Sequence, residues 1–484
     1  MIYLLLAVGI GSAQNAPIPF GALPSERVLR WHEMELYGLV HFGLNTFQGK
    51  EWGYGDADPK IFDPKLFDAE QIVLAAKAGG LKGLILVAKH HDGFALWPTT
   101  TTDYNISKSP WRNGKGDMVR EFQKATAKHG LKFGIYCSPW DRNHKDYGTP
   151  EYLKAYREQL RELYTNYGDL FISWHDGANG GDGYYGGARE KRNIDHTTYY
   201  DWETTWAMTR RLQPNAVIFS DIGPDVRWVG NEKGFAGETS WATFTPTAPD
   251  GIGKPAPGFS NYKDSPVGTR NGKFWIPAEC DVPLRPGWFY HSKEDTEVRT
   301  PDQLFDLYFK CVGRGANLDL GLAPDKRGLM HDADVRSLRE FGEMLNRTFA
   351  VNFAKGATVR ASNIRARNAR SFGPLHLLDS DRYSYWATDD GATTAEVTFE
   401  FASDRTFSII RLRENIKLGQ RIESFAVDAW QNRGWKEVAK GTSIGANRLV
   451  RLPAKVETRR VRLRITRSAV SIALSEFGLF AEPN

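Results

Sequence analysis

The sequence has few cysteines and no long apolar run, and both absences narrow the class of protein. Its 484 residues include only three cysteines, Cys137, Cys280 and Cys311. Their number and irregular spacing do not fit a disulfide framework or a zinc module, so we expect them to be buried small hydrophobic side chains. No stretch approaches the roughly 18 consecutive apolar residues of a membrane-spanning helix. We therefore expect no membrane span.

The sequence also lacks a strong bias toward one sign of charge. Lys and Arg number 63, against 58 Asp and Glu. From Phe353 onward the basic excess is larger, with 22 basic and 14 acidic residues, but many arginines there alternate with apolar residues, as in segments 411–413 and 462–464. This alternation is typical of the solvent-facing side of a β-sheet. We favour that interpretation over a nucleic-acid groove and expect no nucleic-acid partner.

The first residues resemble a secretory signal peptide. A short apolar run after Met1 is followed by small residues around Ala13, although no basic residues precede the run. We expect residues 1–16 to be a signal peptide and the protein to be exported, to the periplasm or outside the cell. No cysteine follows the run, which argues against a lipoprotein anchor.

Between about residues 37 and 324, apolar strand-like runs recur with helical patterns between them. The runs are mostly continuous rather than alternating, as expected for parallel strands buried on both faces. They are Tyr37–Gly43, Gly80–Lys89, Leu131–Ser138, Asp169–Gly177, Asn215–Asp221, Lys273–Cys280 and Ala316–Ala323, with a less regular sixth strand near Glu238–Phe244. The expected helices include Asp68–Lys77, Lys115–His129 and Thr149–Tyr167. The pattern predicts an α/β fold, a (β/α)₈-like TIM barrel over residues 17–350.

The pattern changes after Asn346. Helical periodicity stops, and short strands bounded by Gly, Asn and Asp follow. The expected strands are Glu396–Phe401, Phe407–Arg413, Ser424–Trp430, Arg459–Ile465 and Glu476–Phe480. They predict an all-β sandwich domain over residues 351–484.

Polar side chains are concentrated at the carboxyl ends of the predicted barrel strands, where barrel enzymes carry their active sites. Histidines, tryptophans and carboxylates dominate these ends, in the segments 40–43, 51–52, 89–97, 136–141, 174–180 and 225–232. Flat rings suit a sugar ring and polar groups suit its hydroxyls. The strand ends therefore predict a carbohydrate pocket.

A metal site is the alternative for His41, His90 and His91. Adjacent residues at the end of an extended strand point in opposite directions, so His90 and His91 cannot easily reach one ion. No other cluster with metal-ligand spacing is present. We expect no metal and no other cofactor, while core or surface packing remains the plain alternative for each histidine.

Two carboxylates stand out. Asp176 ends an apolar strand, with Trp174 on the same side of the strand and His175 facing the helix layer. A buried carboxylate there is costly unless it is functional, although capping of a following helix is an equal alternative. Glu232 lies 56 residues later in a loop rich in Gly and Asn. Such a pair fits retaining glycoside hydrolysis, which needs a nucleophile and an acid/base about 5–5.5 Å apart.

Several motifs together resemble glycoside hydrolase family 29, the α-L-fucosidases, over residues 20–350. They are His41-Phe42-Gly43, Glu51-Trp52, Lys89 to Phe94, Tyr136, Trp174-x-Asp176-Gly177 and Asn317 to Pro324. The resemblance implies a retaining exo-glycosidase on a barrel with Asp176 as nucleophile. It also implies a fucose pocket lined by His41, Glu51, Trp52, His90, His91, Tyr136 and Trp174. The sequence departs from the family pattern at His175, where an aromatic residue is usual.

The acid/base is assigned by a second, local resemblance. The run from Gly223 to Glu232 is similar to the branch of the family that prefers α-1,3 and α-1,4 fucosyl linkages, which makes Glu232 the acid/base. Glu238 and Glu279 remain alternatives. Trp288 would present an apolar surface to the C6 methyl of fucose, unless it is ordinary core packing.

The C-terminal segment around Leu377 to Trp386 resembles discoidin-like (F5/8 type C) sandwiches, which bind sugars in some proteins and only brace the catalytic domain in others. The whole sequence therefore predicts an enzyme that removes terminal α-1,3/1,4-linked L-fucose from branched, Lewis-type oligosaccharides. A non-catalytic fucose-binding lectin-like protein and a barrel glycosidase for another sugar are the alternatives.

Overall fold

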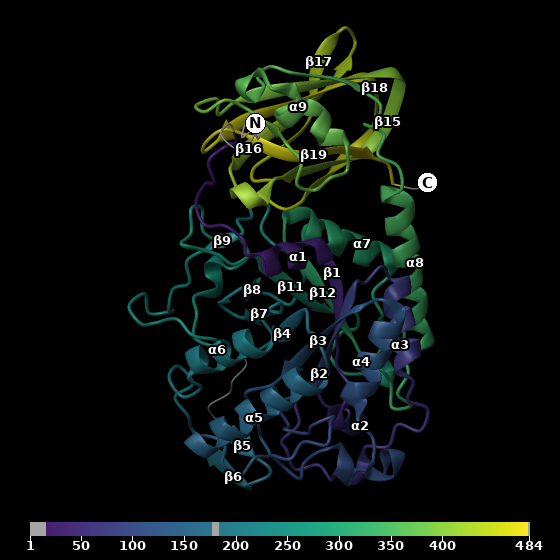
Figure 1. The fold of residues 1–484 in the computed structure, drawn as a ribbon. Helices are drawn as coiled ribbons and strands as arrows, with labels where there is room; N and C mark the ends of the chain where they lie inside the picture. The colour runs from purple at the N-terminus through teal and green to yellow at the C-terminus, as the bar shows by residue number, and fades with distance from the viewer. Residues whose placement is uncertain (1–15, 177–182, 483–484) are drawn as a thin grey trace, which may run out of the picture.

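The computed structural model describes residues 16–176 and 183–482. An α/β barrel forms the lower part of the molecule in Figure 1, and a β-sheet domain forms the upper part. The predicted signal peptide lies almost wholly outside the described residues. Among the residues described, none of the helices has the length and hydropathy that a membrane crossing requires. All three cysteines are buried and free, as predicted.

Eight parallel strands close into a barrel in the order β1-β12-β11-β8-β7-β4-β3-β2. Their side chains are almost all buried, because the barrel interior covers one face and the helices cover the other. The strands are β1 (Leu36–Val40), β2 (Gly83–Lys89), β3 (Lys132–Cys137), β4 (Ile172–Trp174), β7 (Val217–Ser220), β8 (Val226–Trp228), β11 (Ala278–Pro283) and β12 (Asn317–Leu322). The predicted barrel is thus confirmed.

Helices cover the outside of the barrel, and local sequence explains where they begin. The Asp68 and Asp117 side chains accept backbone N–H groups at the starts of α3 and α4, and Pro150 opens α5 without needing an N–H partner. The barrel helices are α3 (Ala69–Ala78), α4 (Met118–His129), α5 (Pro150–Asn166), α6 (Trp202–Leu212), α7 (Pro301–Lys310) and α8 (Asp332–Phe349). Helices α1 (Glu26–Met34) and α2 (Leu44–Gln48) flank β1.

The predicted sixth strand near Glu238–Phe244 is wrong. The sixth barrel strand is β8, and the described segment 221–225 that joins it to β7 contains no helix. Thr243–Phe244 forms β9, which pairs with β10 (Phe274–Trp275) away from the barrel. The buried Arg227 of β8 holds the segment between β8 and β11 in place by donating to the carbonyls of Ser265, Trp241 and Ile276. Without flanking helices, a strand of three residues has no periodic signal in the sequence.

The C-terminal domain is an antiparallel sheet in the order β14-β19-β15-β18-β16-β17, with β13 paired to β15. Two of the predicted strands are halves of the single strand β15, which pairs with β18 across register shifts. The strands are β13 (Thr358–Ala361), β14 (Trp386–Ala387), β15 (Ala395–Glu414), β16 (Ile422–Gln431), β17 (Gly434–Gly441), β18 (Arg448–Ser468) and β19 (Ala473–Phe480). Phe399, Leu412 and Leu463 belong to its own buried core.

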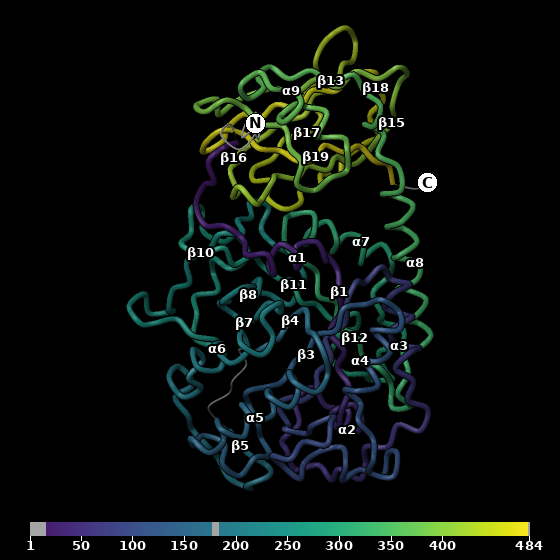
Figure 2. The backbone as a smooth tube through the Cα atoms, viewed as in Figure 1, coloured from purple at the N-terminus to yellow at the C-terminus, as the bar shows by residue number. Residues whose placement is uncertain are grey.

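The sandwich packs against the amino-terminal end of the barrel, opposite the carboxyl ends of its strands (Figure 1). Glu35, just before β1, accepts charged hydrogen bonds from Arg382 and Arg413. The predicted solvent-facing role is therefore wrong for Arg413, because its partner lies on the barrel. The N-terminal segment runs along the sandwich before it enters α1 (Figure 2). In this segment the Phe20 N–H donates to the Leu418 carbonyl of the sandwich.

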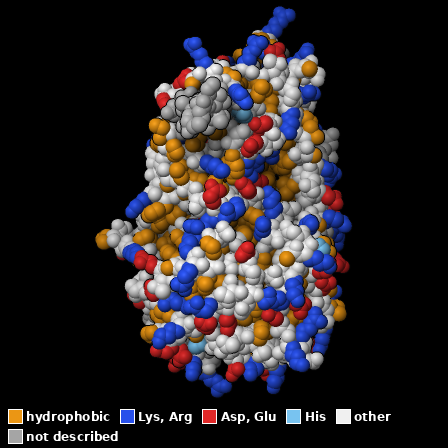
Figure 3. Space-filling view, in the orientation of Figure 1, with side chains coloured by type: hydrophobic (Ala, Val, Ile, Leu, Met, Phe, Trp, Pro, Cys, Tyr) orange, Lys and Arg blue, Asp and Glu red, His pale blue; other side chains and the backbone are white. Residues whose placement is uncertain are grey.

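Acidic and basic side chains are interspersed over the face of the molecule shown in Figure 3. On the sandwich, Arg462 and Arg464 both pair with the nearly buried Asp428. These two arginines lie on the outer side of the sheet, while Leu463 between them is buried. The alternation at this segment is therefore that of a sheet with one covered face, as predicted.

Candidate active site

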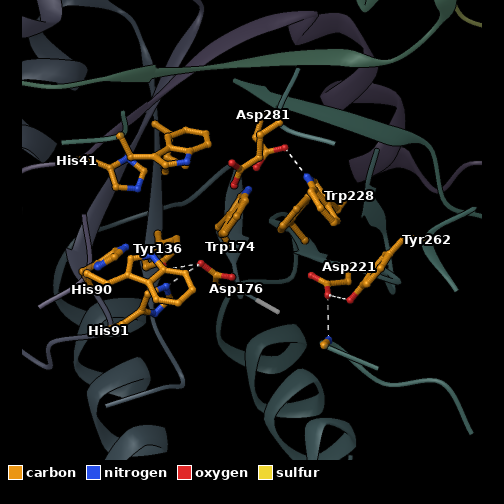
Figure 4. Close-up of a pocket in the computed structure, with 16 residues that line it drawn as sticks. His41, His90, His91, Tyr136, Trp174, Asp176, Asp221, Trp228, Tyr262 and Asp281 are labelled. Atoms are coloured by element: carbon orange, nitrogen blue, oxygen red, sulfur yellow. Dashed lines mark hydrogen bonds and ion pairs between the residues drawn. The ribbon is translucent and has the colours of Figure 1, made fainter. Parts of the chain in front are cut away.

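A cavity of about 270 Å³ lies at the carboxyl ends of the barrel strands (Figure 4). It is smaller than the roughly 300–1,000 Å³ of typical drug-sized ligand sites, which suits one sugar ring. It is lined by Leu39, His41, Trp52, His90, His91, Tyr136, Trp174, Asp176, Phe219, Asp221, Trp228, Glu232, Gly258, Tyr262, Asp281 and Trp288. Both predicted catalytic carboxylates and all the predicted binding residues except Glu51 are in this set.

Asp176 follows β4, and two neighbouring side chains orient its carboxylate. The Tyr136 hydroxyl donates to Asp176 Oδ2 at 2.7 Å, and His91 Nε2 lies 3.5 Å from the same oxygen. His91 is in turn oriented through Nδ1, which is 2.7 Å from Ser138 Oγ. Figure 4 shows Asp176 at the centre of the cavity, between these rings and Asp221. The carboxylate is thus held in one orientation and reaches the space where a sugar would bind.

The three histidines of the cavity are buried and neutral near pH 7. Burial lowers the pKa of His41 and of His91 to about 3, and it lowers the pKa of His90 well below its usual value. A neutral imidazole offers one donor and one acceptor. The cluster therefore suits hydroxyl groups better than anions.

The prediction that His90 and His91 point in opposite directions is wrong. Both line the cavity, with ring centroids 4.1 Å apart, because β2 ends at Lys89 and the pair lies in the turn that follows. The buried Lys89 ammonium anchors this turn by donating to Asp141 and Gln159. Within residues 16–176 and 183–482, no three His, Cys, Asp or Glu side chains are arranged to hold a metal ion.

Trp174 forms part of the cavity wall and is fixed from behind. Its ring stacks on Phe219 with centroids 4.1 Å apart and on Tyr136 at 5.1 Å. Its indole N–H donates to Glu279 Oε1 at 2.7 Å. Trp174 and Asp176 therefore face the same side of the chain, as the alternation of β4 predicts. His175 between them faces the helix layer, also as predicted, where its Nδ1 lies 3.1 Å from the Tyr156 hydroxyl of α5.

Glu232 is the glutamate that lines the cavity. It follows β8 and is exposed at the cavity mouth. Partial burial of its carboxyl raises its pKa, a hydrogen bond from the Trp288 side chain opposes the rise, and the negative charge of Asp176 adds to it. A carboxyl with a raised pKa beside a second carboxylate is suited to donate a proton.

The two alternative glutamates lie outside the cavity. The Glu238 side chain is 82% exposed and lies 3.8 Å from Arg314, while its carbonyl accepts from Arg448 of the sandwich. Glu279 is fully buried behind Trp174 and also accepts from the Tyr37 hydroxyl. Neither side chain is placed to protonate a group bound in the cavity.

Glu51 does not line the cavity but supports its wall. Its carboxylate accepts from the backbone N–H groups of Trp288 and Phe289, at 2.8 and 3.3 Å, and lies 2.8 Å from His291 Nε2. Trp288 itself packs on His41 with ring centroids 5.0 Å apart. Glu51 therefore orients the loop that carries Trp288.

Five further polar or aromatic side chains of the cavity were not predicted from the sequence: Phe219, Asp221, Trp228, Tyr262 and Asp281. Asp221 accepts from the Gly258 N–H and the Tyr262 hydroxyl, and burial raises its pKa to about 6. Asp281 is fully buried and accepts from Trp228 Nε1 at 2.6 Å, and burial raises its pKa well above the usual value. Each aspartate directly follows or ends a predicted strand, so the rule that identified Asp176 could have found both.

The sequence profile of the alpha-L-fucosidase family matches residues 19–348. This match covers the barrel and every residue of the cavity. The chain belongs to the alpha-L-fucosidase family. It is a glycoside hydrolase of this class, and its C-terminal domain, residues 358–477, matches the F5/8 type C domain.

Known relatives resemble this fucosidase over nearly its full length. Alpha-L-fucosidase 1 of Arabidopsis thaliana is 40% identical over 469 residues, which are 96% of this chain and 89% of the plant protein. A glycoside hydrolase 29 family member from an unknown rumen bacterium is 37% identical with a TM-score of 0.84, covering 96% of this chain and 78% of the other. A GH29 fucosidase of Ruminococcus gnavus in complex with fucose is 30% identical with a TM-score of 0.86, covering 99% and 98%.

Proposed function

We propose that this fucosidase is a retaining exo-enzyme that releases terminal α-1,3- or α-1,4-linked L-fucose from branched, Lewis-type oligosaccharides. The main support is the small cavity that contains Asp176, held by Tyr136 and His91, together with Glu232 at its mouth. A pocket with room for one sugar ring favours removal of terminal sugars. The linkage preference rests on the run from Gly223 to Glu232.

In the first step, an Asp176 oxygen attacks the anomeric carbon and the glycosidic carbon–oxygen bond breaks. Glu232 gives its proton to the departing oxygen, and a fucosyl ester of Asp176 forms. In the second step, Glu232 as a carboxylate removes a proton from water, whose oxygen attacks the same carbon and frees Asp176. Two inversions release α-L-fucose with retained configuration.

The electrostatics of the cavity support this change of role. The negative charge of Asp176 contributes to the raised pKa of Glu232. Formation of the ester removes that charge, so the pKa of Glu232 falls and its carboxylate becomes the stable form when a base is needed. The neutral histidines supply donors and acceptors to the fucose hydroxyls in both steps.

A panel of three substrates tests the specificity. We expect cleavage of a trisaccharide carrying α-1,3 or α-1,4 fucose, slower cleavage of a simple aryl α-L-fucoside, and little or none of a linear α-1,2-fucosylated trisaccharide. Equal cleavage of all three would contradict the linkage preference and reopen the choice of acid/base. Release of galactose but not fucose from the matching aryl glycosides would contradict the assignment of the sugar.

We also propose that the protein is exported, on the basis of the apolar run that begins the sequence. N-terminal sequencing of the mature protein would then start near residue 14–17. A mature protein that retains Met1 would contradict export through this segment.

A further inference from the structure

Three large aromatic side chains are exposed beside the cavity mouth. Trp52 is 52% exposed, Tyr54 42% and Tyr184 38%. Trp52 and Tyr54 come from the loop after β1, and Tyr184 comes from the hairpin of β5 (Gly183–Tyr185) and β6 (Glu190–Arg192). We call these three residues the aromatic strip. Most aromatic residues of this protein are buried. Exposed rings near the cavity mouth therefore indicate a surface that contacts a ligand.

The strip begins in the fucose cavity itself. Trp52 lines the cavity, and its ring centroid lies 5.5 Å from that of His91, which contacts Asp176. The Trp52 ring also meets Trp140 edge-on at 5.3 Å. Because this contact uses a ring edge, half of the Trp52 side chain remains accessible. A ligand that leaves the cavity past His91 therefore meets an indole first.

The buried side chains of Trp140 and Arg142 connect Trp52 to the two tyrosines of the strip. The Arg142 guanidinium lies 5.0 Å from the Trp140 ring centroid and 4.4 Å from that of Tyr54. The Tyr54 ring in turn meets Tyr184 edge-on at 6.1 Å. Trp52 and Tyr54 follow β1, Trp140 and Arg142 follow β3, and Tyr184 follows β4, so loops from three strands of the barrel meet in this region.

Backbone hydrogen bonds hold the strip in place. The Gly186 N–H donates to the Tyr54 carbonyl at 2.7 Å, and Arg142 Nη2 donates to the Tyr184 carbonyl at 2.7 Å. The approach at Gly186 is so close that a Cβ there would lie 2.5 Å from the Tyr54 oxygen. The backbone that carries Tyr54 and Tyr184 is therefore held in place before a ligand binds, which lowers the entropic cost of binding.

We propose that the aromatic strip binds the pyranose rings of the oligosaccharide from which fucose is cleaved. The cavity of about 270 Å³ suits one sugar ring, so we place the rest of a branched substrate outside it. Pyranose rings present apolar C–H faces that pack on aromatic rings and hydroxyls that reach the tyrosine hydroxyls. This inference rests on the proposed function, since it gives a binding site to the oligosaccharide that leaves in that same reaction.

The test compares two substrates in the double variant Tyr54→Ala/Tyr184→Ala. We expect the ratio of kcat/KM for the fucosylated trisaccharide to kcat/KM for the aryl α-L-fucoside to fall about tenfold, mainly through KM, the factor given by loss of aromatic contacts of ordinary strength. Tyr54→Phe/Tyr184→Phe retains the rings and should retain most of the ratio. A matched melting temperature would show that the fold is intact.

Phe274→Ala is the matched control. Phe274 is 46% exposed but lines a separate cavity beside α6, with Trp202 and Trp206. The ratio should not change in this variant. A fall in the ratio for Phe274→Ala but not for the tyrosine variant would place the leaving group in the other cavity and overturn the proposal.

Inhibition by the leaving group provides an independent measurement. N-acetyllactosamine, which carries no fucose, should inhibit wild-type hydrolysis of the aryl fucoside, and the double alanine variant should need about tenfold more of it. Equal inhibition of both proteins, or an unchanged substrate ratio, would refute the strip as a binding site. A wild-type protein that cleaves neither fucosylated substrate would instead refute the proposed function.

Discussion

Removal of the Trp288 indole N–H should move the alkaline limit of activity to higher pH. Partial burial raises the pKa of Glu232, and the hydrogen bond from Trp288 opposes this rise by stabilising the carboxylate. Trp288→Phe deletes the donor but leaves a ring to pack on His41. The pKa of Glu232 therefore increases. Because Glu232 must be protonated in the first step, kcat/KM persists to higher pH.

The size of the shift follows from the strength of one hydrogen bond. A bond to a charged group contributes about 1.5–3 kcal/mol where it is buried. Glu232 is exposed, so solvent screening reduces this to about 1 kcal/mol. At about 1.36 kcal/mol per pH unit, the alkaline limit should rise by roughly 0.7 units.

The assay is the pH dependence of kcat/KM for the best fucosylated substrate, because this parameter reports groups of the free enzyme. Trp202→Phe is the control, since Trp202 lies beside His175 in the helix layer and should leave the profile unchanged. An alkaline limit in Trp288→Phe that stays in place or moves to lower pH would refute the assigned coupling between Trp288 and Glu232.

Three further changes test the framework of the site. Glu35→Ala breaks a nearly buried contact between the domains and should cost about 3 kcal/mol of unfolding free energy at pH 7. Burial opposes ionisation of Glu35, but Arg413 and Arg382 hold its pKa below the usual value. The stability lost in Glu35→Ala should therefore become smaller below about pH 4. A loss of less than about 1 kcal/mol at pH 7 would contradict the role of Glu35 as an ion-pair partner between the domains. Burial raises the pKa of Glu279 to about 7, so ionisation of Glu279 should cost the wild type about 3 kcal/mol of unfolding free energy between pH 4.5 and 7. In denaturant titrations Glu279→Gln should lose about that much less over this range. In Gly321→Ala a Cβ would lie 2.7 Å from the Trp288 ring, so kcat/KM should fall at least about tenfold, the effect of misplacing a wall of the site; wild-type kinetics would refute this.

The parts of the fold with regular periodicity could be predicted from the sequence. Six barrel strands are recognisable because parallel strands buried on both faces are continuously apolar. The predicted strand Lys273–Cys280 instead joins β10, which lies outside the barrel, to the first three residues of β11. β8 has three residues and no adjoining helix, so only its neighbours in space identify it. The division of β15 into two predicted strands has a similar cause, since its partner shifts register near Glu400 and the apolar alternation is interrupted there.

The site could be predicted where it follows strand ends, and not where loops reach in. Asp176 and Trp174 follow from the alternation of one strand. His90 and His91 share the cavity because a turn, rather than the strand, orients them. Tyr262 belongs to a long segment without periodicity, and its position depends on the hydrogen bond to Asp221. The role of Glu51 depends on a loop more than 230 residues away in the chain.

The configuration of fucosyl azide formed by two variants tests the central claim most directly. In Glu232→Ala, with a fucoside whose leaving group needs no proton, azide should attack the fucosyl ester of Asp176 and give α-L-fucosyl azide after two inversions. In Asp176→Ala, azide should attack the substrate directly and give the β-anomer after one inversion. Proton NMR distinguishes the two products. The opposite anomers, or wild-type hydrolysis by Asp176→Ala, would contradict Asp176 as nucleophile and Glu232 as acid/base.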